Sequence, residues 1–81
     1  MDRITILGLD PIGISIGLAL SSAGLKDTEI LGTDPNNKII RQALKINAID
    51  TGEGNLKSAI KSARLLIINR PFSESEELLE A

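Results

Sequence analysis

The chain has 81 residues, of which 42% are hydrophobic, and a formal net charge of −2 at pH 7. This length is enough for one small domain, and we expect residues 1–81 to form a single domain. The nearly balanced charge does not indicate a nucleic acid or an anionic membrane as a partner. Because the sequence contains neither histidine nor cysteine, it excludes disulfides, thiolate metal sites and histidine acid–base chemistry in this chain, and we expect no metal site.

The N-terminal segment lacks the features of a targeting sequence. Its first apolar run is short and is broken by glycine and aspartate. No apolar run in the sequence reaches the length that spans a bilayer. These features predict a cytoplasmic protein without a membrane segment.

The first half of the sequence predicts two strand–helix pairs. Residues 3–9 (RITILGL) are β-forming residues whose pattern suits a strand buried on both faces. Residues 12–24 predict a helix that is apolar on nearly all sides, that ends with Gly24 as its C-cap, and that we expect to be well buried. Residues 28–34 predict a second strand, and residues 35–47 predict an amphipathic helix.

The second half continues the alternation. Residues 48–50 predict a brief third strand, and residues 55–63 carry apolar side chains at helical spacing. Residues 64–69 (RLLIIN) are the clearest buried strand of the sequence. Residues 73–81 predict a short acidic helix, because Ser73 and Glu76 have the spacing of a capping box.

This order of elements predicts an α/β fold. Strands that alternate with helices form a parallel sheet with helices on both faces and right-handed crossovers. We expect about four strands with flanking helices, which is half of a doubly wound sheet, with the strand order 3-2-1-4. The fourth strand would then lie at an edge of the sheet.

Four segments, in order, resemble one enzyme family. Residues 4–20 (ITILGLDPIGISIGLAL) combine a strand, a turn close to Gly-x-Gly-x-x-Gly and a long apolar helix. Residues 30–37 (ILGTDPNN) place an acidic residue after the second strand, residues 47–52 read NAIDTG, and residues 69–71 read Asn-Arg-Pro at the end of the fourth strand. Together they resemble the N-terminal NAD(P)-binding domain, of the Rossmann type, of prephenate and arogenate dehydrogenases, which act in tyrosine synthesis.

The resemblance implies a cofactor site for NAD, with NADP as the alternative. It places Gly8 at the tight turn after the first strand and Gly13 where the helix packs closely on the sheet. The candidate cofactor-binding residues are Gly8, Asp10, Ile12, Gly13, Asp34 and Arg70. No residue of this chain is assigned a catalytic role, because the family's substrate pocket and catalytic histidine lie largely beyond the matched region.

Asp10 stands where the fingerprint has its middle glycine, and two interpretations of it remain open. In the family, that glycine allows the backbone to approach the diphosphate, whereas a carboxylate adds bulk and a like charge. Alternatively, Asp10 caps the first helix and Pro11 occupies its first position, so that the carboxylate accepts the N–H groups that a phosphate would take. On this second interpretation the fold is kept and tight dinucleotide binding is lost.

The roles of Asp34 and Arg70 also remain open. By resemblance Asp34 binds the ribose hydroxyls of the adenosine and favours NAD over NADP. By local chemistry it caps the second helix, with Pro35 at the first position, and both roles can coexist. Arg70 follows the fourth strand, where an ion pair with Asp10, a phosphate contact and a solvated side chain are all compatible with the sequence.

Two functional hypotheses follow. The first is the cofactor-binding part of a prephenate-dehydrogenase-like oxidoreductase, whose phosphate loop is degenerate and which is not active alone. The second is a non-catalytic or engineered fragment that keeps the fold and serves as a structural or interaction module. Under either hypothesis we expect a homodimer or a partner domain to cover the edge of the fourth strand at residues 64–69.

Overall fold

The structure, a computed structural model, describes residues 2–69. The elements in chain order are β1 (Asp2–Leu7), α1 (Pro11–Ser22), β2 (Thr28–Thr33), α2 (Asn37–Lys45), β3 (Thr51–Gly52), α3 (Leu56–Lys61) and β4 (Leu65–Ile68). The predicted acidic helix over residues 73–81 and the candidate residue Arg70 lie outside the described residues. Within residues 2–69, no helix has the length and apolar character needed to cross a membrane.

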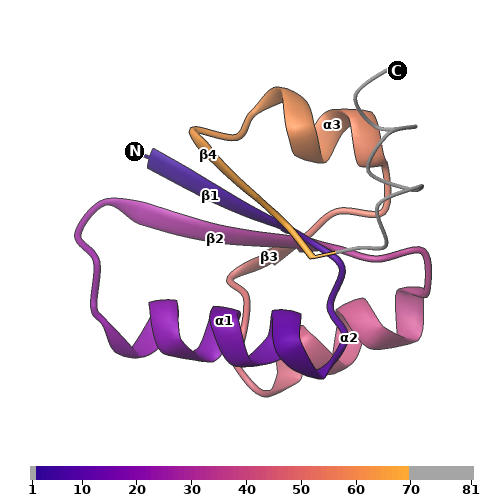
Figure 1. Cartoon of the computed structure of the whole chain (residues 1–81), viewed down its shortest axis with the longest axis horizontal. Coiled ribbons are helices and arrows are strands. Elements are labelled where there is room, and N and C mark those ends of the chain that lie inside the picture. Colours follow the sequence, from indigo (N-terminus) through magenta and orange to yellow (C-terminus); the bar gives the residue numbers. More distant parts are fainter. Residues whose placement is uncertain (1, 70–81) are drawn as a thin grey trace.

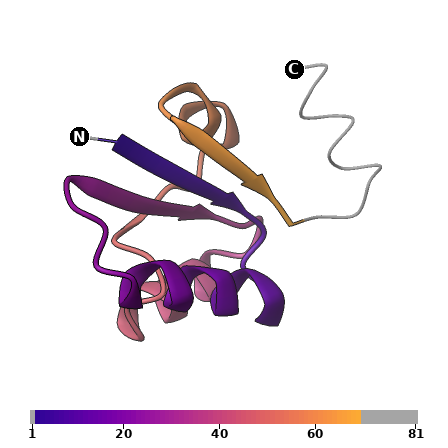
Figure 2. The same cartoon turned by 60° about the vertical axis from the view of Figure 1, so that its left-hand side comes forward.

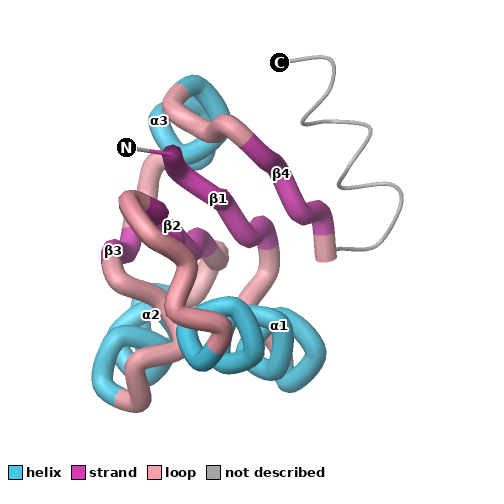
Figure 3. The backbone as a smooth tube through the Cα atoms, turned by 90° about the vertical axis from the view of Figure 1, so that its left-hand side faces the viewer, coloured by secondary structure: helices cyan, strands magenta, loops and turns pink. Residues whose placement is uncertain are grey.

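The four strands form one parallel sheet with the order β3-β2-β1-β4 (Figure 1). This order and the parallel pairing confirm the predicted α/β fold and its 3-2-1-4 arrangement. Helices α1 and α2 lie on one face of the sheet, and α3 lies on the other (Figure 3). Because the strands are parallel, their carboxyl ends lie at the same end of the sheet, where the turns into α1 and α2 also lie.

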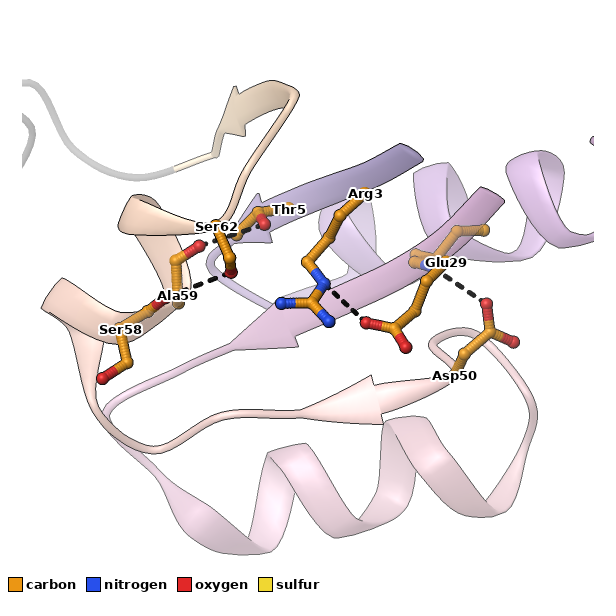
Figure 4. A network of polar contacts seen from close by, with 8 residues as sticks. Arg3, Thr5, Glu29, Asp50, Ser58, Ala59 and Ser62 are labelled. Atoms are coloured by element: carbon orange, nitrogen blue, oxygen red, sulfur yellow. Dashed lines mark hydrogen bonds and ion pairs between the residues drawn. The ribbon is translucent and has the colours of Figure 1, made fainter. Parts of the chain in front are cut away.

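The main core lies between the sheet and the helix pair α1–α2. Its buried residues come from β1, β2, α2 and the segments beside them: Ile6, Leu9, Ile30, Ile40, Ala43, Ala48 and Ile49. Residues 4–7 are all buried, which confirms that β1 is covered on both faces. On the α3 side, the Thr5 hydroxyl donates a hydrogen bond to the carbonyl of Ala59 at 3.2 Å, and this contact satisfies both buried groups (Figure 4).

One ion pair lies on the same face as Thr5. Arg3 and Glu29 are register partners on β1 and β2, and the Arg3 Nε and Glu29 Oε1 atoms are 2.6 Å apart (Figure 4). The two groups are not aligned as a hydrogen bond. We therefore treat the contact as an electrostatic pair of modest value, because both side chains are partly exposed.

The third strand begins later than predicted. The expected segment was 48–50, whereas β3 consists of Thr51 and Gly52. The Asp50 carboxylate accepts a hydrogen bond from the backbone N–H of Ile30 at 2.9 Å (Figure 4). The Asp50 N–H donates in turn to the Ile30 carbonyl at 2.8 Å. A side chain thus replaces a backbone acceptor at this point, and the ladder with β2 starts one residue further on.

Helix α1 is less buried than the sequence predicts. In α1 only Gly13 and Gly17 are buried, and the Ile12 side chain is 64% exposed. Gly13 and Gly17 pack against the backbone of Gly8 and Ala48, which lie outside the strands, and the α1 side chains that pack on the core are only partly buried. The end of the helix also shifts slightly, since Ala23 is its C-cap and Gly24 follows with a φ of 61°.

The strand β4 was expected to be the clearest buried strand, and this expectation is wrong for the described residues. Among residues 2–69, it lies at the edge of the sheet and pairs with β1 alone (Figure 2). Its two terminal side chains are exposed, Leu65 to 54% and Ile68 to 39%. The apolar pattern was interpreted correctly as a strand, but it does not reveal how many neighbours the strand has.

Candidate functional site

The turn between β1 and α1 and the first residues of α1 contain four of the candidate residues. Gly8 follows β1 with a φ of 98°, a conformation that glycine adopts without steric strain. Its N–H donates to the carbonyl of Thr33 at 2.9 Å, which ties the turn to the end of β2. A Cβ atom at Gly13 would overlap the Gly8 carbonyl. The start of α1 therefore packs directly on the end of β1, in the geometry that the fingerprint predicts for these two glycines.

Asp10 caps α1. Its Oδ1 atom accepts hydrogen bonds from the backbone N–H groups of Ile12 and Gly13, both at 3.0 Å. Pro11 is the first residue of the helix, where its missing N–H leaves no donor unpaired. The capping geometry expected for Asp10 and Pro11 is therefore present, and the carboxylate itself is exposed to solvent.

Asn69, just after β4, completes the environment of Asp10. Its Nδ2 atom donates to Asp10 Oδ1 at 2.6 Å and to the Gly8 carbonyl at 3.3 Å. Both of these partners can only accept a hydrogen bond, so the amide nitrogen, rather than the amide oxygen, must face them. The same Nδ2 atom would lie 2.9 Å from a Cβ at Gly13, so a glycine at position 13 also leaves room for the Asn69 amide.

These donors hold Asp10 in its charged form. The N–H of Gly13 makes the largest contribution to lowering the pKa of Asp10 below its ordinary value, followed by the Asn69 amide. Desolvation acts in the opposite direction, and the N–H of Ile12 lowers the pKa further. The start of α1 thus carries a charged carboxylate of the chain's own at neutral pH.

Asp34 connects the turn after β2 to the turn after β1. Its Oδ2 atom accepts a hydrogen bond from the backbone N–H of Leu9 at 2.9 Å, and its Oδ1 atom accepts one from Asn36 at 2.9 Å. The N-cap of α2 is Asn36, whose side chain accepts from the N–H of Lys38 at 2.9 Å. The expectation that Asp34 caps this helix, with Pro35 at its first position, is therefore wrong: the Leu9 N–H recruits Asp34, and the helix starts two residues later.

The remaining candidates have different positions. Ile12 contributes its N–H to the cap, while its side chain points to solvent. Arg70 lies outside the described residues. Sequence reasoning missed Leu9 as the partner of Asp34 and Asn69 as the partner of Asp10. For Asn69 a signal existed, since it stands where the resemblance has a small residue, whereas nothing in the local sequence marks Leu9.

An apolar groove lies beside the turn that joins β1 to α1, between α1 and α2. Its volume is about 370 Å³. The lining residues are Leu9, Asp10, Pro11, Ile14, Ile39, Gln42 and Ile46. Among residues 2–69, no group of three or more acidic side chains is placed to hold a metal ion.

A comparison with solved structures supports the fold. This chain matches the crystal structure of prephenate dehydrogenase from A. aeolicus in complex with hydroxyphenyl propionate and NAD⁺, with a TM-score of 0.84 and 24% sequence identity. The match covers 96% of this chain and 27% of that chain. It shows a shared Rossmann-like fold, which is the fold that the resemblance in the sequence implies. No protein-family model matches the sequence, and no curated protein matches it either.

The turn fits a bound dinucleotide only in part. The tight turn at Gly8 and the close contact at Gly13 preserve the framework on which a diphosphate rests at a helix N-terminus. The N–H groups of Ile12 and Gly13, which would face the anion, already donate to Asp10. The described residues therefore keep the glycine framework of the turn, and the Asp10 carboxylate already accepts from the N–H groups at the start of the helix.

Proposed function

We propose that this chain is an NAD-binding-type domain of a prephenate-dehydrogenase-like oxidoreductase, with weak affinity for the dinucleotide. The shared fold and the NAD⁺ in the neighbour's crystal structure support the cofactor class. The observation that carries the weak affinity is the Asp10 carboxylate bound at the start of α1. Two unit charges about 4 Å apart repel by roughly 4 kcal/mol at an effective dielectric constant near 20, which corresponds to about a thousandfold in affinity.

This proposal concerns binding and not catalysis by the chain alone. The resemblance implies NAD(P)-dependent dehydrogenation of prephenate or arogenate, in which a histidine takes part. The chain contains no histidine, and it spans about a quarter of the length of the neighbour. We therefore assign it no catalytic residue and propose that hydride transfer needs a further domain or partner.

The test is calorimetric titration of NAD into the wild type and into Asp10→Gly. We expect wild-type binding to be weaker than low micromolar, and the glycine variant to bind at least about tenfold more tightly, because a charge and its bulk leave the phosphate position. Asp27→Gly is the matched control. It removes one exposed carboxylate just before β2, at the amino ends of the strands and so away from the turn that holds Asp10. Low-micromolar binding by the wild type, or no gain from Asp10→Gly, would contradict the proposal.

Asp34 is proposed to set a preference for NAD over NADP. Each of its oxygens accepts one hydrogen bond from the backbone, which leaves acceptor capacity for a ribose diol. Its charge would repel a 2′-phosphate. In the Asp10→Gly background, we expect NAD to bind more tightly than NADP and Asp34→Ala to reduce that ratio; an unchanged ratio would remove Asp34 from the cofactor site.

A structural or interaction module is the second candidate, and the edge strand β4 favours it. Its exposed apolar side chains and unpaired outer edge, as the described residues leave it, are features that attract another strand. We propose that the chain forms a homodimer through this edge. Light scattering at tens of micromolar should give a dimer mass that Leu65→Lys lowers to that of a monomer, while Leu44→Lys, at an exposed side chain of α2, does not. A folded monomer in the wild type would exclude this candidate.

A further inference from the structure

Two side chains that are 59 positions apart meet over the start of α1. Asp10 occupies the turn after β1, and Asn69 follows β4, yet the Asn69 Nδ2 and Asp10 Oδ1 atoms are 2.6 Å apart. At both positions the sequence departs from the family that it resembles: Asp10 replaces the middle glycine of the fingerprint, and Asn69 replaces a small residue after the fourth strand. The direct contact indicates that the two departures belong to one arrangement.

We propose that Asn69 is a positioning residue that excludes the dinucleotide by holding the Asp10 carboxylate over the start of α1. The inference rests on the proposed function and extends it, because it names the residue that controls access to the phosphate position. Asn69 acts through Asp10 in the wild type and does not itself contact the ligand.

The geometry makes Asn69 an effective anchor. Its backbone N–H donates to the Leu7 carbonyl at 2.8 Å, which fixes the residue against the end of β1. Its amide nitrogen is shared between Asp10 and the Gly8 carbonyl. All three hydrogen bonds that reach the Asp10 carboxylate from the described residues end on Oδ1, and Asn69 provides the shortest of them.

Loss of the amide should release the carboxylate. Asp10 is exposed, so without Asn69 its side chain can exchange the cap for water through an ordinary rotamer change. The N–H groups of Ile12 and Gly13 then become available to an anion part of the time. Asn69→Ala should therefore improve dinucleotide binding in the wild-type background.

The same amide should have the opposite effect once Asp10 is absent. In Asp10→Gly, the Asn69 Nδ2 atom keeps only the long contact to the Gly8 carbonyl at 3.3 Å. It then lies beside the place that the carboxylate has left, as a donor for a diphosphate oxygen. Asn69→Ala should weaken binding in this background. A residue that only supported the fold would change the affinity in the same direction in both backgrounds.

The experiment is a double-mutant cycle in NAD affinity over the wild type, Asn69→Ala, Asp10→Gly and the double variant. We expect Asn69→Ala to tighten binding about fivefold in the wild type and to weaken it about fivefold in Asp10→Gly, each change being the value of one hydrogen bond. Asn55→Ala is the control, because it removes the amide that caps α3 without touching Asp10. Changes of the same sign in both backgrounds would overturn the inference.

A second measurement needs no ligand and separates this inference from the proposed function. An NMR titration should show a higher pKa for Asp10 in Asn69→Ala than in the wild type, because an amide donor to the charged form is lost. An unchanged pKa would overturn the inference. A raised pKa with no NAD binding by Asp10→Gly would overturn both the proposed function and the exclusion role, while leaving the contact itself as real.

Discussion

The turns after β1 and β2 have nearly the same sequence, LGLDP at residues 7–11 and LGTDP at residues 31–35, and they fold differently. In the first turn, Asp10 caps the helix and proline is its first residue. In the second turn, Asp34 turns back to the Leu9 N–H, the proline stays outside the helix, and Asn36 becomes the cap. One local pattern thus has two outcomes within a single sheet.

The two glycines of the pattern differ as well. Gly8 lies beyond the end of β1 with a positive φ, whereas Gly32 is still within β2, where a Cβ would press on the Ile49 side chain at 2.7 Å. The strand β2 extends two residues further through the pattern than β1 does, since β1 ends at Leu7 and β2 at Thr33. An Asp-Pro pair after a strand can therefore cap the following helix, but a backbone donor from a distant part of the chain can bind the aspartate instead.

The largest expected effect comes from the third residue after each aspartate. Gly13→Ala should lower the free energy of unfolding by about 1–3 kcal/mol or more, because its Cβ would overlap the Gly8 carbonyl, which belongs to the backbone and cannot move aside easily. At the matching position of the second turn, Asn37→Ala should change stability by less than about 0.5 kcal/mol, since that residue is exposed. Urea unfolding of both variants makes the comparison, and equal losses would contradict it.

The next effect separates the two aspartates. Asp34→Ala leaves the N–H of Leu9 without its partner, and since Leu9 is only 2% exposed, we expect a loss of about 1–3 kcal/mol. Hydrogen exchange at the Leu9 amide should accelerate selectively in this variant. Unaltered exchange at that amide would show that Asp34 is dispensable for the contact between the turns.

The smaller effect tests the caps. Asp10→Ala and Asn36→Ala should each cost about 1 kcal/mol, the usual value of an N-cap, which lowers the melting temperature by about 4–8 °C in a domain of this size. We expect the two variants to lose similar stability, although Asp10 and Asn36 stand at different places relative to the repeated pattern. A melting temperature that Asp10→Ala leaves unchanged would mean that the carboxylate does not stabilise the helix.

The smallest effect is the pH dependence of the Asp10 cap. The pKa of Asp10 is lowered in the folded state, so the charged cap contributes stability above the ordinary pKa of 3.8 and loses it as the pH falls through the lower folded value. The difference in melting temperature between the wild type and Asp10→Ala should therefore be constant near neutral pH and shrink below about pH 3.8. Asn36→Ala, which removes an uncharged cap, should show no such decrease.

The sequence predicted the features that depend on local pattern and alternation. The parallel sheet, its strand order, the helix positions and the Asp10 cap all follow from the apolar periodicity and from a strong capping residue beside proline. The prediction failed where a distant group competes, as at Asp34 and at Asp50, whose side chain replaces a ladder acceptor. It also failed for the burial of α1 and β4, because an apolar run indicates a surface that can be covered and not the element that covers it.

The candidate site was predicted as a set of positions rather than as an arrangement. Gly8, Asp10, Ile12 and Gly13 were placed together because they are neighbours in sequence, and the structure confirms this proximity. The contact of Asn69 with Asp10 spans 59 positions and depends on the parallel register of β1 with β4. A single sequence does not encode that register in any local signal, so the partner of Asp10 could be found only in the fold.

The hydrogen bond from Leu9 to Asp34 has a consequence for the order of folding. It joins residues 25 positions apart, so the turn after β1 is completed by a non-local contact and not by its own sequence. Such contacts form only after the chain has paid the entropy of closing the intervening loop, here α1 and its connection to β2. In a chain synthesised from its N-terminus, β1 and α1 emerge first with the turn between them unfinished, and that turn reaches its final shape only when β2 docks.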